Sequence, residues 1–99
     1  MSTKFAEFLA EDRRLVILRA LEACGGYESN ESLIATVVRQ FGHVVSRDQV
    51  RTDFAWLREQ GLVTIEEIEG LMIATLTQRG FEAATGIITT PGIKRPSPK

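Results

Sequence analysis

The chain has 99 residues, of which 43% are hydrophobic and 25% charged, and its formal net charge is −1 at pH 7. This length allows one domain, and the apolar content is enough for a compact core. The near-neutral charge excludes the strong basic excess of a dedicated non-specific nucleic-acid binder. The single cysteine, Cys24, excludes an intramolecular disulfide.

The first predicted element is helical and runs from Thr3 to Cys24. Its apolar residues recur at the three-to-four spacing of a helix, beginning with Phe5, Phe8 and Leu9. Asp12 is suited to cap a new helix, so the segment is either one bent helix or two. A pair of glycines ends it.

A second helix is predicted to begin near Asn30, capped by Ser29 or Asn30, and to end at Gly42. A third helix is predicted over 46–60, where Ser46 is the cap and a glutamine three residues later completes a capping box. The link between these two helices is short, so we expect them to cross close to each other. Val50, Phe54 and Leu57 form the apolar face of the third helix.

Two short strands are predicted over 62–67 and 71–76, joined by a tight hairpin turn. A brief third strand, if it forms, would be the Glu28–Ser29 region. Thr77 is predicted to cap a last helix that runs to about residue 84. We expect a domain over residues 1–88, followed over 89–99 by a mobile, basic and proline-rich tail that has little apolar surface to bury.

Two motifs carry a resemblance to a known family. The third helix ends in Leu-Arg-Glu-Gln-Gly-Leu-Val over 57–63, and the last helix begins with Leu-Thr-Gln-Arg-Gly over 76–80. Both motifs resemble those of winged helix-turn-helix transcription regulators, particularly the arsenic-repressor type, and the whole chain resembles small winged-helix proteins of Mu-like phages. The resemblance implies a mainly α fold with a small β-hairpin, that is, an α+β winged helix-turn-helix.

The resemblance also implies a sequence-specific regulator of transcription that places its third helix in the major groove of double-stranded DNA. The Ser46 end of that helix offers unpaired backbone amides and a partial positive charge, which favour a phosphate. Arg47 and Arg51 suit guanine or phosphate, Gln49 suits adenine, and Thr52 suits a thymine methyl group. The same side chains also fit an ordinary solvated helix face.

Four further basic residues are candidates for contacts with the DNA backbone, namely Arg13, Arg14, Lys94 and Arg95. The first two also fit surface ion pairs, and the last two also fit a tail that only adds solubility. The hairpin departs from the resembled families because it carries three glutamates, at positions 66, 67 and 69, and no basic residue. Its carboxylates would repel a phosphate backbone.

Two hypotheses about function follow. The first is the DNA-binding regulator, expected to form a homodimer through Phe5, Phe8, Leu9 and Phe81, because the aromatic residues among them exceed what so short a domain needs for its own core. The second is a protein–protein interaction module of winged-helix fold, with little or no DNA binding, in phage assembly or packaging. The acidic hairpin favours the second.

Other functional classes find no support in the motifs. A phosphate-binding loop, a nucleophile elbow and a zinc-protease motif are absent from the sequence, so we expect no enzyme. We also expect no cofactor and no metal site. No apolar run of about 18 residues is present and the N-terminus lacks an apolar signal core, so we expect a cytoplasmic protein without membrane contact.

Overall fold

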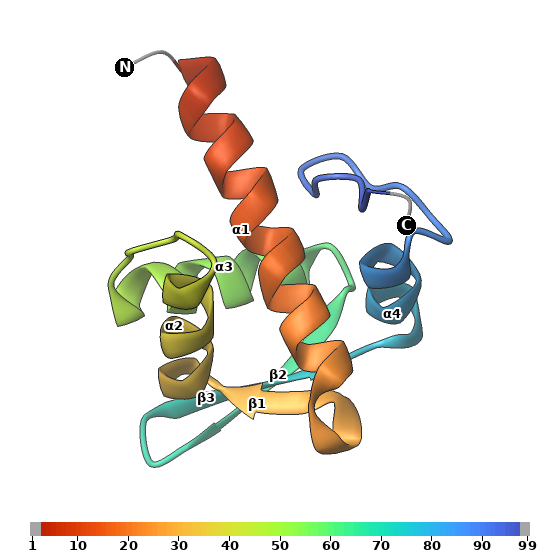
Figure 1. Cartoon of the computed structure of the whole chain (residues 1–99). Coiled ribbons are helices and arrows are strands. Elements are labelled where there is room, and N and C mark those ends of the chain that lie inside the picture. The colour runs from red at the N-terminus through yellow and green to blue at the C-terminus, as the bar shows by residue number, and fades with distance from the viewer. Residues whose placement is uncertain (1–2, 98–99) are drawn as a thin grey trace.

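The computed structural model describes residues 3–97, and this part of the chain contains four α-helices and a three-stranded antiparallel sheet (Figure 1). The α+β class predicted from the sequence is therefore confirmed. In chain order the elements are α1 (Thr3–Ala23), the 3-10 turn η1 (Gly25–Tyr27), β1 (Glu28–Asn30), α2 (Glu31–Gln40), α3 (Arg47–Glu59), β2 (Val63–Ile68), β3 (Leu71–Leu76) and α4 (Gln78–Thr85).

Helix α1 is one continuous helix, which decides between the two predicted alternatives. Asp12 does not start a new helix. Its carboxylate instead lies 2.6 Å from Nε2 of His43, in the link between α2 and α3, and 3.2 Å from Nζ of Lys94. The first buried residue of α1 is Leu15, and only the N-terminal turns of α1 extend past the rest of the molecule (Figure 1).

Side-chain caps begin the other three helices, as the sequence predicted. Asn30 accepts two backbone N–H groups of the first turn of α2, and Thr77 Oγ1 accepts one from α4 at 3.0 Å. Ser46 Oγ accepts the backbone N–H of Gln49 at 3.0 Å. The capping box is only half formed, because the Gln49 side chain donates to Asp53 at 3.2 Å and not back toward Ser46.

The sheet has the order β1-β3-β2, with all pairs antiparallel. The brief third strand predicted around residues 28 and 29 is β1, which pairs with β3. Glu69 and Gly70 form the turn of hairpin β2–β3 with φ values of 51° and 81°. Two successive positive φ values are the geometry of a type I′ turn, which matches the right-handed twist of the strands.

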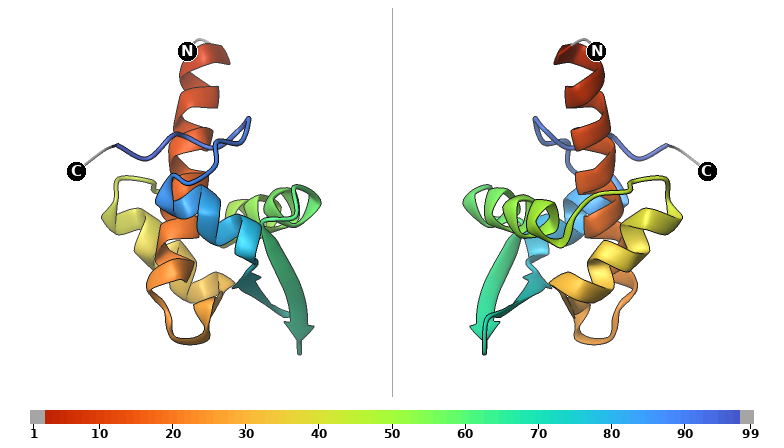
Figure 2. Two further views of the ribbon diagram at one scale, coloured as in Figure 1. Left: turned by 90° about the vertical axis from the view of Figure 1, so that its right-hand side faces the viewer. Right: turned by 90° about the vertical axis from the view of Figure 1, so that its left-hand side faces the viewer.

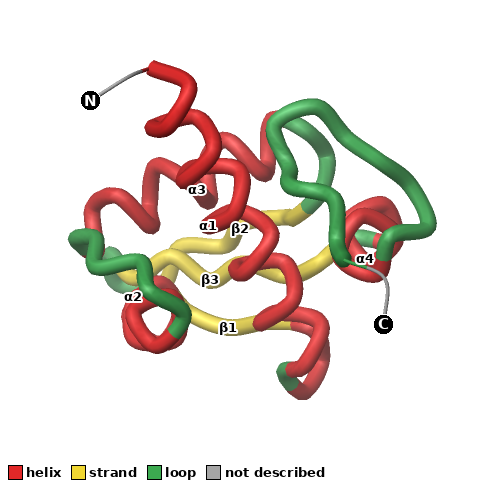
Figure 3. The backbone as a smooth tube through the Cα atoms, turned by 45° about the horizontal axis from the view of Figure 1, so that its top comes forward, coloured by secondary structure: helices red, strands yellow, loops and turns green. Residues whose placement is uncertain are grey.

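The core lies where α1 crosses above the sheet, between α2 and α4, with α3 behind it (Figures 1 and 3). Apolar faces of all these elements meet there, and the largest fully buried side chains include Ile17, Leu18, Leu21, Ile34, Phe54 and Leu57. Each such side chain stabilises the fold by about 1.5–3 kcal/mol relative to exposure. The predicted apolar face of the third helix is confirmed, since Val50, Phe54 and Leu57 are all fully buried.

The segment after α4 returns along α1, which sequence reasoning did not anticipate. The backbone N–H of Lys94 donates to the carbonyl of Glu11 at 3.2 Å, and Arg14 Nη1 donates to the carbonyl of Gly92 at 3.0 Å. Gly92 has a φ of 89°, and a Cβ added there would lie 2.5 Å from the ring of Trp56.

These contacts join residues that are far apart in the sequence, so no local sequence pattern predicts them. The domain boundary at residue 88 and the mobility of the tail stay predictions. Residues 98 and 99 of that tail, and residues 1 and 2, lie outside the described residues.

Candidate nucleic-acid interface

Helix α3 and hairpin β2–β3 lie on the same side of the molecule, away from the projecting end of α1 (Figure 2). The N-terminal end of α3 is exposed, with Ser46 as its cap and Arg47 in its first turn. Thr52 is also exposed, whereas Gln49 and Arg51 are half-buried. The five residues predicted to contact DNA therefore share one end of α3, but they are not equally accessible.

A buried carboxylate joins this end of α3 to two other elements. Glu31, the first residue of α2, is 1% exposed. Its oxygens accept hydrogen bonds from Arg47 Nε at 2.8 Å, Arg51 Nη1 at 2.6 Å and the backbone N–H of Met72 at 2.6 Å. One side chain thus ties α2, α3 and β3 together through charge-assisted hydrogen bonds.

Arg51 reaches from α3 to the turn of the hairpin. Its Nη1 also donates to the carbonyl of Gly70 at 3.0 Å, and its Nη2 lies 3.6 Å from Oε1 of Glu67. Arg51 holds the hairpin in place and offsets part of its acidic charge. Its side chain is 34% exposed, against 54% for Arg47, so Arg47 presents the more accessible guanidinium.

The surroundings of Glu31 keep it ionised. Burial by itself would raise its pKa, but the hydrogen bonds from the Met72 amide and from Arg47, with the charges of Arg51 and Arg47, outweigh burial and lower the pKa below its ordinary value. The carboxylate therefore stays negative and keeps both arginines paired as the solution becomes mildly acidic.

This shift predicts a specific pH dependence of stability. The folded-state pKa of Glu31 lies below its unfolded-state value of about 4.3. Its contribution is therefore complete above that value and is lost as pH falls through the folded-state pKa. We expect urea midpoints measured between pH 7 and pH 3 to fall less steeply for Glu31→Gln than for wild type. Parallel curves for the two proteins would contradict the expectation.

The lowered pKa of Asp12 remains in wild type and in Glu31→Gln, so both proteins lose the same part of their stability at low pH through Asp12. Burial raises the pKa of Asp12, while hydrogen bonds to His43 and Lys94 outweigh that effect. A second variant, Asp12→Asn, separates this common part from the Glu31 contribution.

A second buried carboxylate, Asp53, connects α3 to α1. It is 2% exposed and accepts Arg13 Nε at 2.5 Å and Arg13 Nη2 at 3.0 Å, which is a two-bond arginine–carboxylate pair. The amide of Gln49 donates to the same carboxylate at 3.2 Å. Gln49, assigned to adenine from the sequence, therefore has a protein acceptor.

The other basic candidates also have contacts within the protein. The Arg14 guanidinium lies 4.0 Å from the ring centroid of Trp56, in addition to its bond to the C-terminal segment. Lys94 pairs with Asp12 and lies 5.6 Å from the ring centroid of Phe8. Arg95 is exposed. Contacts of these residues with a DNA backbone stay predictions.

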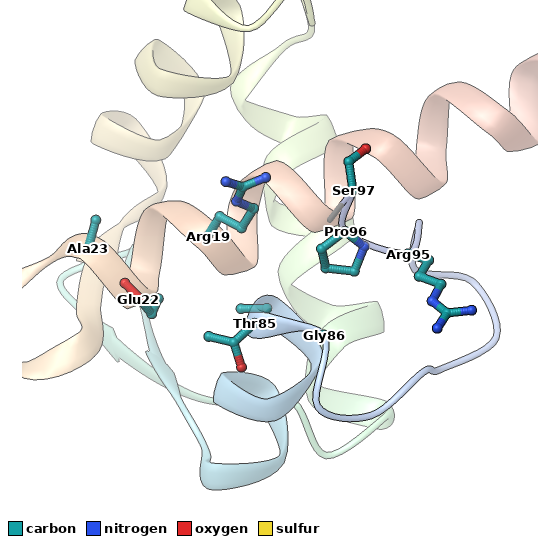
Figure 4. Close-up of a pocket in the computed structure, with 9 residues that line it drawn as sticks. Arg19, Glu22, Ala23, Thr85, Gly86, Arg95, Pro96 and Ser97 are labelled. Carbon is teal, nitrogen blue, oxygen red and sulfur yellow. The ribbon is translucent and has the colours of Figure 1, made fainter. Parts of the chain in front are cut away.

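A broad, open hollow lies between α1, the end of α4 and the C-terminal segment (Figure 4). Arg19 and Arg95 line it, but the picture shows their guanidinium groups pointing in different directions. Glu22 lines it as well. The hollow therefore does not concentrate positive charge on one point.

Residues 3–97 contain neither a candidate metal site nor a candidate membrane span. No group of three or more histidine, cysteine, aspartate and glutamate side chains there is arranged to hold a metal ion. Within the same range, none of the helices combines the length and the apolar character needed to cross a membrane.

Sequence reasoning missed both buried carboxylates. Asp53 had a local signal, because it lies three residues after Val50 and four before Leu57, on the apolar face of the helix. An acid at such a position requires a buried partner. Glu31 had none, because an acid in the first turn of a helix is already accounted for by the positive end of the helix dipole.

Comparison with known proteins shows two close relatives. The chain is 48% identical over 93 residues to the uncharacterized protein gp26 of Escherichia phage Mu, covering 94% of this chain and 96% of the relative. It is 44% identical over 96 residues to an uncharacterized protein of Haemophilus influenzae, covering 96% of this chain and 93% of the relative. No protein-family model matches the chain.

Proposed function

The chain belongs to the same family as gp26 of phage Mu, and we propose that it is a sequence-specific DNA-binding regulator of Mu-like phages with a winged helix-turn-helix fold. In this proposal α2 and α3 are the helix-turn-helix, α3 enters the major groove, and hairpin β2–β3 is the wing. The observation that carries the proposal is the buried Glu31 carboxylate, which joins α2, α3 and the wing through hydrogen bonds.

The order and placement of the elements support the fold assignment. The helix-turn-helix is followed by a hairpin beside α3, and a third strand completes a small sheet under α1 (Figures 1 and 3). This arrangement leaves the N-terminal end of α3 exposed beside the hairpin. Recognition helices of this fold class present that same end to base edges.

The chemistry of the α3 end supports DNA as the ligand. The first turn of a helix offers backbone amides and a partial positive charge to a phosphate. Arg47 adds a guanidinium whose Nε is held by Glu31 while more than half of the side chain stays exposed. A group held in place at one atom loses less freedom when its other atoms bind a ligand.

The wing has a smaller role in this proposal. Glu66, Glu67 and Glu69 lie on it, and only Glu67 is paired with a described basic residue, Arg51. Carboxylates at a phosphate backbone cost binding energy. We therefore assign DNA contact to α3 and assign to the wing the task of fixing its position.

A specific observation favours the second candidate function, a protein–protein interaction module. Ile68 at the end of the hairpin is 49% exposed and has acidic neighbours in Glu67 and Glu69. Protein–protein contacts have an apolar centre and a polar rim, and a basic partner surface would complement these carboxylates. The experiment below separates the two functions.

We expect the chain to select a specific duplex from random DNA fragments and to bind it less tightly as salt rises. Arg47→Ala should weaken binding by about 5- to 150-fold, since a bidentate guanidinium contact to a base contributes about 1–3 kcal/mol. Fluorescence anisotropy titrations at several salt concentrations measure both effects. Arg39→Ala, which removes an exposed arginine from the last turn of α2, is the matched control and should leave the affinity unchanged.

The DNA proposal fails if no duplex binds at low salt. It also fails if both arginine variants weaken binding equally, because α3 would then have no special part in it. The first result favours the interaction module.

A further inference from the structure

Helices α1 and α2 lie side by side (Figure 1), and an apolar groove runs between them. The side chains that line it include Val16, Ala20 and Ala23 from α1, Leu33 and Val37 from α2, and Phe41 directly after α2. Leu33 is 58% exposed and Phe41 is 65% exposed. The groove therefore presents an apolar surface that the monomer does not cover.

The projecting half of α1 is apolar on the same face. Phe5 and Phe8 both belong to α1, and their side chains are 50% and 51% exposed. Phe8, Asp12, Val16 and Arg19 follow one another at spacings of four, four and three residues, so they lie along one face of α1. One helix face thus carries an apolar projection at one end and one wall of an apolar groove at the other.

From this geometry we infer that a second copy of the chain fills the groove. In a two-fold symmetric dimer, the projecting half of α1 from each copy lies in the α1–α2 groove of the other. An antiparallel α1 pair with its axis near Asp12 places Phe8 opposite Val16 and Phe5 opposite Arg19 of the partner subunit. A two-fold axis repeats each contact, so the projection and the groove of both copies are covered at once.

Charge also fits this pairing. Residues 3–11 of the projecting half contain one lysine and two glutamates, a sum of −1. The charged residues that line the groove are Asp12, Arg19 and Lys94, a sum of +1. Asp12 would lie near its own symmetry mate, but its contacts with His43 and Lys94 offset its charge.

The other segment of this chain close to the groove is already placed. The C-terminal segment forms one end of the groove through Lys94 and Ser97, and its backbone is bonded to α1. It therefore extends the wall of the groove and does not occupy it. Of the predicted dimer residues, Phe5, Phe8 and Leu9 belong to the proposed contact, whereas Phe81 packs against the core and the ring of Tyr27.

The test is the mass of the full-length protein in solution without DNA. Light scattering after size exclusion should give about 22 kDa, twice the 11.0 kDa of one chain, at high micromolar concentration. Phe8→Glu and Leu33→Glu should each reduce the mass to that of one chain, because each places a charge in the contact. Ile68→Glu changes an equally exposed residue on the hairpin and should leave the dimer intact. Circular dichroism confirms that each variant is folded.

Cross-linking tests the direction of pairing. Phe8→Cys and Val16→Cys are made separately in a Cys24→Ala background, mixed and oxidised. Antiparallel pairing should yield mainly the mixed disulfide, because position 8 of one copy then lies opposite position 16 of the other. A disulfide mainly between two Phe8→Cys chains would overturn the pairing.

A mass of one chain at every concentration, or a Phe8→Glu protein that stays dimeric, would also overturn the inference. The first of these results would leave the groove to a different protein. Since no DNA is present, neither bears on the proposed DNA binding.

Discussion

Glu31→Ala is expected to destabilise the protein by about 2–4 kcal/mol, because it removes a buried carboxylate that is paired with two partly exposed arginines and leaves a buried backbone amide unpaired. The substitution leaves Arg47, Arg51 and the Met72 amide without their shared acceptor in a site where the carboxylate is 1% exposed. A total stability of about 5–15 kcal/mol is usual for such domains, so the loss is a large fraction of it. Urea denaturation at pH 7 measures the change.

Two further variants separate the causes of that loss. Glu31→Gln keeps the volume and an acceptor for the Met72 amide but removes the charge, so it should cost less, about 1–3 kcal/mol. Glu66→Ala removes an exposed carboxylate from the hairpin and should change stability by less than about 0.5 kcal/mol. Equal effects of Glu31→Ala and Glu66→Ala would show that the buried contacts do not hold the fold.

Gly80→Ala is expected to destabilise the protein although Gly80 lies inside α4. Helix propensity alone predicts the opposite, because alanine is favoured over glycine in a helix by about 1 kcal/mol. A Cβ at Gly80 would clash with the carbonyl oxygen of Leu62 and would lie 2.7 Å from Cδ1 of Leu76. Because the first obstacle is backbone, the helix must shift, and overpacking of this kind costs about 1–3 kcal/mol or more.

A matched control exists in the same chain. A Cβ at Gly25 meets no atom within 4 Å, so Gly25→Ala should be nearly neutral. Thermal melts of the two variants give the comparison, with a drop of several degrees expected for Gly80→Ala alone. A Gly80→Ala protein as stable as wild type would mean that α4 can move away from Leu62 at little cost.

The close approach at Gly80 gives a physical reason for one motif of the resemblance. The backbone N–H of Thr77 donates to the Leu62 carbonyl at 3.1 Å, and Thr77 Oγ1 donates to the carbonyl of Gly61 at 2.7 Å. These bonds bring the start of α4 against the end of α3. The glycine three residues after Thr77 is then the residue that fits beside the Leu62 carbonyl.

The elements of this protein were predictable because their signals are short. Each cap, at Asn30, Ser46 and Thr77, bonds backbone groups within three residues. The hairpin turn is two residues long, and strand β3 has the predicted bounds of Leu71–Leu76. Patterns of this range are complete within the sequence window in which they are read.

The candidate site was predictable only in part. Its location at the end of α3 followed from the local motif, but the states of its side chains did not. The sequence predicts that Gln49 contacts adenine and Arg51 contacts guanine or phosphate, and the structure gives both of them acceptors inside the protein. The assignment of Gln49 and Arg51 to DNA stays a prediction. Among the predicted DNA contacts on α3, Arg47 is the arginine with the more exposed side chain.

The sequence by itself determined the helices, their caps, the hairpin and the α+β class, since each depends on residues a few positions apart. Only the tertiary structure decided which charges are paired. The partners of Glu31 lie 16, 20 and 41 residues away, and those of Asp53 include one 40 residues away. A carboxylate becomes a buried anchor only when chain folding removes water from it and brings arginines to it, and no local pattern records that event.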